Sequence, residues 1–242
     1  DDFAGLVGLK SVIEDELSRR SMTENVFRTL IEPQLVARNE PAAGLSELLY
    51  KDHHHLLARR LAADWLEHVP GLTDSVEAEL ATKLVRSGSF GILRRLIAPR
   101  LTSSTPAKLQ LWRAVSVIAD FEATGRLLDD EEIDPALLWG IRDLAGASRY
   151  RDKARVGLSV AQCEWILKTF REAWPLSHPP ARGWSGDRNA WDAGEYLMQV
   201  MTHLARDPSE EAGLALQRSV AYGQRLWKAQ PVGGLSGLGS SP

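Results

Sequence analysis

Three consecutive histidines, His53, His54 and His55, form the first group whose side chains could do chemistry. Imidazole is a common ligand of zinc and other transition metals. Successive residues of a helix point about 100° apart, so three neighbouring histidines cannot all face one ion. No further histidine or carboxylate completes a pair at four-residue spacing on a shared face. The pattern therefore favours a solvated start of a helix, and we predict no metal site.

A second candidate is the pair Arg171 and His178. An arginine followed several residues later by a histidine resembles the helical ribonucleases, whose Arg and His act on phosphate and 2′-hydroxyl. Pro175 lies between the two and is predicted to end the helix that such a motif needs. The sequence also has no Gly-x-x-x-x-Gly-Lys-Ser/Thr loop, and the segment 183–186 is one residue short of a Gly-x-Ser-x-Gly turn. We predict no catalytic residues and no cofactor, and a small RNA-cleaving enzyme is the less favoured alternative.

Two clusters of basic residues could contact an anion. Their members are Arg94, Arg95 and Arg100 in the first cluster and Arg149, Arg151, Lys153 and Arg155 in the second. Guanidinium groups bind phosphate through paired donors, and Tyr150 adds a stacking face to the second cluster. Asp143, Asp152 and the acidic stretch 129–132 reduce the positive field there. A solvated face is the favoured interpretation, Arg149 and Arg151 are kept as partner contacts, and nucleic acid is the less favoured partner.

The elements that position these residues are helices, because apolar residues recur at intervals of three and four. Helix-start chemistry precedes many of the runs, with a side-chain acceptor for the free N–H groups of a first turn. The predicted starts are Asp74-Ser75-Val76-Glu77, Thr105-Pro106, Asp134-Pro135, Ser159-Val160-Ala161-Gln162, Asn189 and Asp207-Pro208-Ser209-Glu210. The last four runs are expected at about 136–146, 159–174, 190–206 and 209–228.

This succession of short helices predicts an all-α fold. Stacked helix pairs without a fixed period favour an irregular HEAT-like α-solenoid, with a compact helical bundle as the alternative. We expect a helical-repeat domain over residues 1–230, with a sub-boundary near 175–189. The Gly/Ser-rich segment 231–242 is expected to be a flexible tail or linker.

Composition and charge exclude several classes of protein. The 242 residues are 44% hydrophobic and 25% charged, which is typical of globular proteins, and the net charge of -3 gives no overall positive field. The lone Cys163 allows no intrachain disulfide and indicates a reducing, cytoplasmic location. No run of 18 apolar residues occurs and residues 1–4 do not resemble a signal peptide, so no membrane contact is expected. A start at Asp1 is expected for a fragment or a processed product.

The segment from Trp174 to Asn189 is the best candidate for a partner contact. Its prolines prevent a helix and its glycines permit tight turns, which places Arg182, Trp184 and Arg188 together on a surface loop. Tryptophan and arginine are enriched at binding hot spots. The alternative is that Trp184 packs the loop onto the helix that starts near Asn189. Four other tryptophans are expected in the core, namely Trp65, Trp112, Trp139 and Trp165.

Three segments near the C-terminus carry a resemblance to a known family. They are Pro179-Pro180-Ala181-Arg182-Gly183-Trp184, Trp191-Asp192-Ala193-Gly194-Glu195-Tyr196-Leu197 and Leu204-Ala205-Arg206-Asp207-Pro208-Ser209-Glu210-Glu211-Ala212. Together they resemble a region downstream of the nucleotide-binding module in bacterial NACHT-type STAND NTPases. The resemblance covers about 40 to 50 residues.

The resemblance implies that the chain is part of a helical sensor region. In that family an effector and a central ATPase precede a helical-repeat region that senses an invader's protein and triggers oligomerisation, a form of antiphage defence. The implied partner is a protein, either a phage protein or neighbouring domains of the same chain. The family's ATP-binding residues have no counterparts here. A HEAT-like adaptor or scaffold remains the alternative.

Overall fold

The computed structural model describes residues 12–13, 15–16, 22–103, 105–128, 134–146, 156–175 and 188–229. Over these residues it contains eleven α-helices, one short 3₁₀ helix and no β-strand, so the predicted all-α fold is confirmed. The choice between solenoid and bundle stays a prediction. None of the described helices combines the length and the apolar character that crossing a membrane requires.

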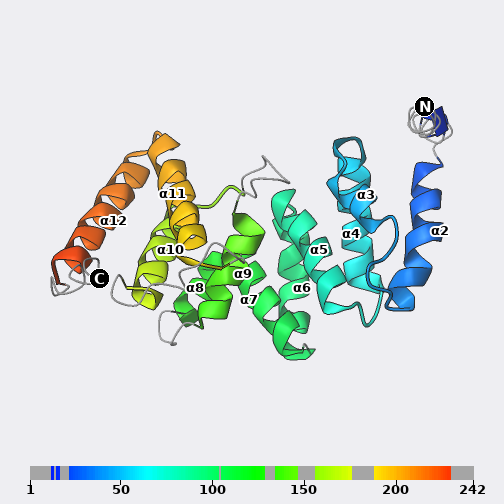
Figure 1. Cartoon of the computed structure of the whole chain (residues 1–242), viewed down its shortest axis with the longest axis horizontal. Coiled ribbons are helices and arrows are strands. Elements are labelled where there is room, and N and C mark those ends of the chain that lie inside the picture. The colour runs from blue at the N-terminus through cyan, green and yellow to red at the C-terminus, as the bar shows by residue number, and fades with distance from the viewer. Residues whose placement is uncertain are drawn as a thin grey trace, which may run out of the picture. The chain divides into compact units, whose positions relative to one another are not determined.

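Figure 1 labels the helices in chain order. They are α2 (Thr23–Val36), α3 (Leu45–Tyr50), the 3₁₀ helix η1 (Asp52–His54), α4 (His55–His68), α5 (Asp74–Arg86), α6 (Phe90–Ser103), α7 (Pro106–Ala119), α8 (Phe121–Leu128), α9 (Pro135–Ala145), α10 (Val160–Ala173), α11 (Ala190–Arg206) and α12 (Glu210–Ala229). The chain divides into two compact units between Ile92 and Leu93, within the first turn of α6. The boundary predicted near 175–189 stays a prediction, and most of that segment lies outside the described residues.

Three helices supply most of the core of the first unit, with α4 packed against α3 and α5. Their buried side chains recur at three- and four-residue spacing, as the sequence predicts. They are Leu45, Leu48 and Leu49 on α3, Ala58, Leu61, Ala62, Trp65 and Leu66 on α4, and Val76, Leu80, Ala81, Leu84 and Val85 on α5. Trp65 also donates its indole N–H to Glu32 of α2 at 2.9 Å, which satisfies the one polar atom of a buried ring.

Arg28 of α2 lies among three carboxylates in the same unit. Its guanidinium contacts Asp64 of α4 at 2.7 Å, Glu32 at 2.6 Å and Glu24 at 3.0 Å. Arg60 of α4 also pairs with Glu24, so the ion pairs join α2 to α4 at two points. The hydrogen bond from Arg28 holds the pKa of the Asp64 carboxyl below its usual value. Charge pairing thus adds to the burial of Phe27, Ile31 and Leu35 in holding α2 on this core.

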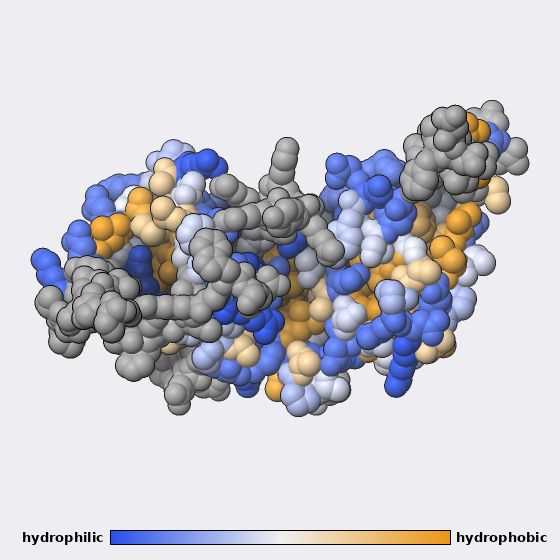
Figure 2. All heavy atoms as spheres, in the orientation of Figure 1, coloured by the Kyte–Doolittle hydropathy of each residue, from blue (hydrophilic) through white to orange (hydrophobic). Residues whose placement is uncertain are grey.

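One face of α2 exposes hydrophobic side chains. Met22, Val26 and Leu30 lie at four-residue spacing and are each exposed. Figure 2 shows hydrophobic residues on the visible face over this helix. An apolar stripe therefore lies open to solvent on α2.

In the second unit, α7 packs along α9 and α10 packs against α9, α11 and α12. A Cβ atom at Gly140 of α9 would lie 3.1 Å from the Cβ of Ala114, so glycine permits the close approach of α7 and α9. Phe170 of α10 joins three helices through its ring contacts, with centroids 6.2 Å from Trp139 of α9 and 5.5 Å from Tyr196 of α11. The core of this unit is therefore aromatic where α9, α10 and α11 meet.

The last four carbonyl groups of α7, those of residues 116–119, are all satisfied without a glycine cap. The first accepts from the backbone N–H of Asp120 at 2.8 Å, and the last accepts from Nε of Arg94 at 2.7 Å. Nε2 of Gln162, which is buried on α10, donates to the carbonyls of Val117 and Ile118 at 2.8 Å each. Helix ends leave four such groups open, so side chains from two other helices complete α7.

Most of the predicted helix starts are confirmed. The side chains of Thr105, Asp134, Ser159 and Asn189 each accept a hydrogen bond from a first-turn backbone N–H. Ser159 forms a capping box with Gln162. The last four helices begin and end within about two residues of the predicted limits.

The helix start predicted at Asp74, whose spacing to Glu77 is that of a capping box, is wrong by one residue. Thr73 is the N-cap, and its hydroxyl accepts from the backbone N–H of Val76 at 3.4 Å. Asp74 is then the first helical residue, where a carboxylate interacts favourably with the helix dipole. Glu77, which was expected to reach back to the cap, is buried instead. A hydroxyl one position earlier was therefore the preferred acceptor.

The start predicted at Asp207-Pro208-Ser209-Glu210 contains two separate interactions. Asp207 accepts from the backbone N–H of Ser209 at 2.9 Å, and Ser209 accepts from the backbone N–H of Ala212 at 3.2 Å. Helix α12 therefore starts at Glu210, behind a serine, and Asp207 shapes the turn that follows α11.

Candidate functional site

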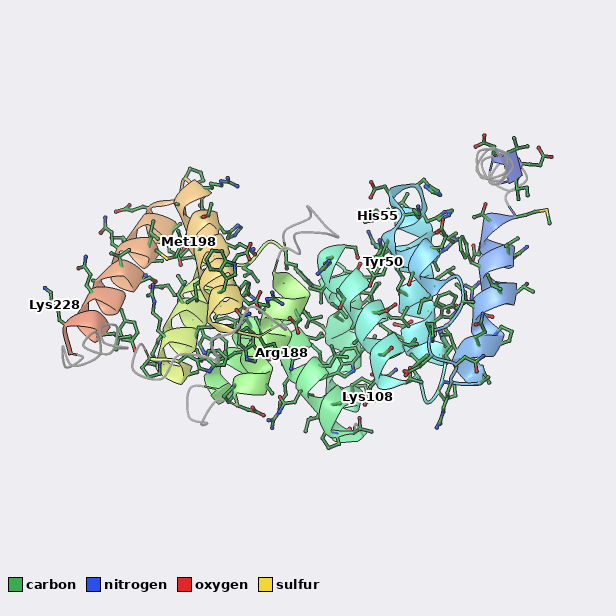
Figure 3. All side chains as sticks on the ribbon, in the orientation of Figure 1. Tyr50, His55, Lys108, Arg188, Met198 and Lys228 are labelled. Carbon is green, nitrogen blue, oxygen red and sulfur yellow. The ribbon has the colours of Figure 1, made fainter. Side chains whose placement is uncertain are left out.

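The structure places only one of the five predicted contact residues. Arg149, Arg151, Arg182 and Trp184 lie outside the described residues, so their roles stay predictions. Arg188 is described and lies at the start of α11 (Figure 3). Its backbone has a φ of 78°, in the left-handed region that few residues other than glycine adopt.

Arg188 is part of a chain of alternating charges between α9 and α11. Its Nη2 lies 3.3 Å from Asp143, which contacts Arg142 at 2.9 Å, and Arg142 in turn contacts Asp192 at 3.0 Å. The side chain of Arg188 is 55% exposed. Arg188 therefore helps to hold the start of α11 against α9, and contact with a partner stays a prediction for it.

An exposed tryptophan lies three residues after Arg188, in the first turn of α11. Trp191 is 64% exposed, and Met198, seven residues later on α11, is 62% exposed (Figure 3). Residues seven apart share a helix face, so two large apolar side chains lie on one side of α11. The four tryptophans expected in the core, Trp65, Trp112, Trp139 and Trp165, are buried, as predicted.

The histidine cluster differs in part from its prediction. His53 and His55 are exposed, whereas His54 is buried and packs edge-on against Phe27, with ring centroids 4.9 Å apart. The expectation of a solvated histidine is wrong for His54, because the turn of η1 directs it toward α2. Among the described residues, no group of three His, Cys, Asp or Glu side chains is arranged to hold a metal ion.

The Arg171 and His178 pair is interrupted where the sequence predicts. Helix α10 ends at Ala173, two residues before Pro175. His178 lies outside the described residues. Arg171 belongs instead to a groove between α10 and α12, two helices that lie side by side in the second unit (Figure 1).

This groove has a volume of about 340 Å³. It is lined by Glu164, Trp165, Lys168 and Arg171 of α10 and by Arg218, Ser219, Tyr222 and Arg225 of α12. On each wall three of the polar side chains follow the spacing i, i+4, i+7, which places them on one face of a helix. The groove is therefore formed by two polar helix faces in matching register.

Glu164 and Arg218 connect the two walls. Nε of Arg218 lies 2.6 Å from one carboxylate oxygen of Glu164, and Nη2 lies 2.8 Å from the other. This paired geometry is the strongest form of an arginine–carboxylate contact. It uses the only carboxylate among the described residues of the lining, so the other three cations of the groove receive no charge compensation from it.

Arg171 is half-buried and crosses from α10 to α12. Its Nη1 donates to the backbone carbonyl of Ser219 at 2.6 Å, and its Nη2 lies 3.9 Å from the sulfur of Met201. No carboxylate of the described residues pairs with it. Burial without a counter-ion lowers the pKa of the Arg171 guanidinium. A Cβ atom at Gly223 would lie 3.5 Å from its Cζ, so α12 approaches the guanidinium closely there.

Tyr222 provides the aromatic surface of the α12 wall. Its hydroxyl donates to Glu172 of α10 at 3.0 Å, which fixes the ring across the groove. Cζ of Arg225 lies 5.9 Å from the ring centroid, within the range of a cation–π contact. Lys168 faces the same space and is exposed. The groove therefore combines an aromatic face with three cations that no carboxylate of its lining neutralises.

Sequence reasoning missed this groove, although part of its signal was present. Charged or aromatic residues recur at i, i+4, i+7 on both predicted helices, as Glu164, Lys168 and Arg171 and as Arg218, Tyr222 and Arg225. What the sequence does not state is that the two faces meet, because more than 40 residues separate them. Comparisons of the chain with protein-family models, with curated proteins and with solved structures found no match.

Proposed function

We propose that the chain is a non-catalytic protein-recognition module and that the groove between α10 and α12 is its binding surface. The observation that carries this proposal is the lining of the groove, in which arginines and aromatic rings surround one recess. Arginine, tyrosine and tryptophan are the residue types that most often dominate the energetics of protein interfaces. A recess between rigid helices also offers a preformed surface, which lowers the entropic cost of binding.

The chemistry of the groove supports binding rather than catalysis. Among the described residues its lining contains no histidine or cysteine, and the one carboxylate there is paired with Arg218. Histidine, a thiolate and an unpaired carboxylate are the groups that most often act as a general base or a nucleophile. The nearest thiol, Cys163, is buried in the core, and burial raises its pKa to about 12. The described walls of the groove therefore offer no histidine, cysteine or unpaired carboxylate for catalysis.

Within this proposal, the chain belongs to the helical sensor region of a cytoplasmic bacterial NACHT-type NTPase. The resemblance of its C-terminal segments to that family supports this origin, and a HEAT-like adaptor is the alternative. We expect isothermal titration with Mg-ATP to give no binding to the chain, since its sequence has no phosphate-cradling loop. Micromolar binding that a mutation inside the chain abolishes would contradict the sensor origin.

A site-specific cross-linker tests whether the groove contacts a protein. Ala221 is exposed on α12 and borders the groove lining, three residues after Arg218 and four before Arg225, so that a long side chain there can reach over the groove. Benzoylphenylalanine at Ala221 should cross-link one defined protein in the producing cells, which mass spectrometry identifies and which then binds the purified chain. The matched control is the same group at Ala107, an exposed alanine of α7. Equal cross-linking at both positions, or none at Ala221, would show that the groove is not the binding surface.

A further inference from the structure

We infer that the groove takes an anionic group of the partner, a carboxylate or a phosphate carried on a peptide segment, which binds among Lys168, Arg171 and Arg225. This inference rests on the proposed function and specifies the chemistry of the ligand.

The balance of charge in the groove is the first argument. Its lining holds four cations and one carboxylate, and Glu164 is already paired through both oxygens with Arg218. Glu172 at the edge accepts the hydroxyl of Tyr222, so that carboxylate is directed to the tyrosine. Neither Lys168 nor Arg225 forms an ion pair with a described residue. Three cations therefore line the recess without an ion pair to a described residue and outnumber the one carboxylate, Glu172, that borders it without an arginine partner, so an anion placed there gains net attraction.

The donors of Arg171 are the second argument. A guanidinium carries five N–H groups in a planar fork. Two of those on Arg171 are directed to the Ser219 carbonyl and the Met201 sulfur, which leaves three without a described acceptor. Placing a half-buried cation without a counter-ion costs free energy, and a bound carboxylate or phosphate would offset it with short charge-assisted hydrogen bonds. The contacts to α12 hold the fork in place before the ligand arrives.

A purely structural role for Arg171 explains only part of the arrangement. The bond to Ser219 does join α10 to α12, and a clasp of this kind needs no further cation. Lys168 and Arg225 take no part in that clasp, yet both lie beside it. Lys168 is three residues before Arg171 on α10, and Arg225 is on the facing wall, α12. Gathering like charges is unfavourable in the absence of an anion. The cluster as a whole is therefore explained by a ligand rather than by helix packing.

The surroundings favour a peptide over a nucleic acid. Nucleic acids bind along an extended stripe of cations that neutralises many phosphates. Here the cations occupy one recess, Glu164 and Glu172 border it, and the chain as a whole carries a net charge of -3. One anionic side chain fits this recess, with Tyr222 and Trp165 available for the apolar atoms beside it.

Fluorescence anisotropy on the full chain tests the inference with three labelled peptides. They are octaglutamate, a Gly/Ser peptide with one phosphotyrosine, and octaglutamine as the neutral control. We expect at least one of the two anionic peptides to bind and octaglutamine not to bind. Comparing the octaglutamate and phosphotyrosine arms tells whether the groove prefers carboxylate or phosphate.

Substitutions then locate the binding. Lys168→Gln and Arg225→Gln, both at exposed positions, should each lower the affinity by about threefold, and Arg171→Gln by about tenfold or more. Lys51→Gln, at an exposed lysine of the first unit, should leave it unchanged. Circular dichroism checks that each variant is folded. If Arg171→Gln fails to fold, the two exposed variants still decide the question.

Three results would overturn the inference. The first is that neither anionic peptide binds, and the second is that a peptide binds with an affinity that the Lys168 and Arg225 variants leave unchanged. The third is that single-stranded oligothymidylate binds more tightly than both peptides through the same residues, which would assign the groove to nucleic acid. Cross-linking at Ala221 that persists when neither peptide binds would leave the proposed function standing and remove only the anionic ligand.

Discussion

Replacing Gln162 by leucine should destabilise the second unit far more than an ordinary change from glutamine to leucine. The buried amide of Gln162 donates to the carbonyls of Val117 and Ile118, and its oxygen accepts from the backbone N–H of Ser159 at 2.8 Å. Leucine has a similar size and can make none of these bonds. Two buried carbonyls and one part-buried N–H then lose their partners, at about 1 kcal/mol each or more, so we expect a cost of about 3 kcal/mol.

The control for this variant is Gln217→Leu on α12, where the glutamine is exposed and should change stability by about 0.5 kcal/mol or less. Gln162→Glu adds a second comparison, because it keeps the acceptor for Ser159 and places an oxygen where the amide donated. At pH 7 its cost should exceed that of leucine, since a carboxylate oxygen would then face two carbonyl oxygens.

Urea unfolding, followed by circular dichroism, measures all three variants. Hydrogen exchange adds a local readout, in which amides of the last turn of α7 should lose protection in the Gln162 variants alone. The reasoning is refuted if Gln162→Leu is within about 0.5 kcal/mol of Gln217→Leu, or if exchange near the end of α7 is unchanged.

Three further measurements address other parts of the molecule. Arg28 lowers the pKa of Asp64, so their pairing stabilises the first unit above the ordinary pKa of 3.8, and this stabilisation is lost as the pH falls below that value. The difference in unfolding free energy between wild type and Arg28→Met should therefore shrink from pH 7 to pH 3. A constant difference would contradict this. Cys163, whose pKa burial raises to about 12, should resist iodoacetamide at pH 8 until urea unfolds the chain, and rapid labelling of the native protein would be the opposing result. Gly194→Ala, with open space around its Cβ, should raise stability by about 0.5–1 kcal/mol in thermal unfolding. Gly140→Ala should gain less or lose stability, because its Cβ would press on α7. Equal gains in the two variants would refute the close approach of α7 and α9.

The helices were predictable because their ends depend on interactions between residues that are close in sequence. Ser159 with Gln162 and Asn189 with Asp192 both form the boxes that start α10 and α11. Such bonds join residues three apart, so one short stretch of sequence is enough to identify them. The end of α10 before Pro175 follows from the same local rules.

Tertiary partners were not predictable from local chemistry. The sequence shows that Gln162 can cap its own helix, but not that its amide also closes the end of α7, 45 residues earlier. The burial of His54 depends on Phe27 from another helix, and the groove depends on two polar faces meeting across α10 and α12. Of the predicted contact residues, Arg188 is placed in an ion pair with Asp143, which no local rule indicates.

The completion of α7 by distant side chains also has a consequence during synthesis. Arg94 precedes α7 in the chain, so a ribosome releases it before the carbonyl that it satisfies. Gln162 follows the two carbonyls that it satisfies by 44 and 45 residues, which a ribosome takes about 2–9 s to add. Throughout that interval the final turn of α7 in the nascent chain has open carbonyls that only water can bind. A chain truncated before Gln162 would therefore have an α7 that frays at its last turn, however well α6 and α9 have already formed.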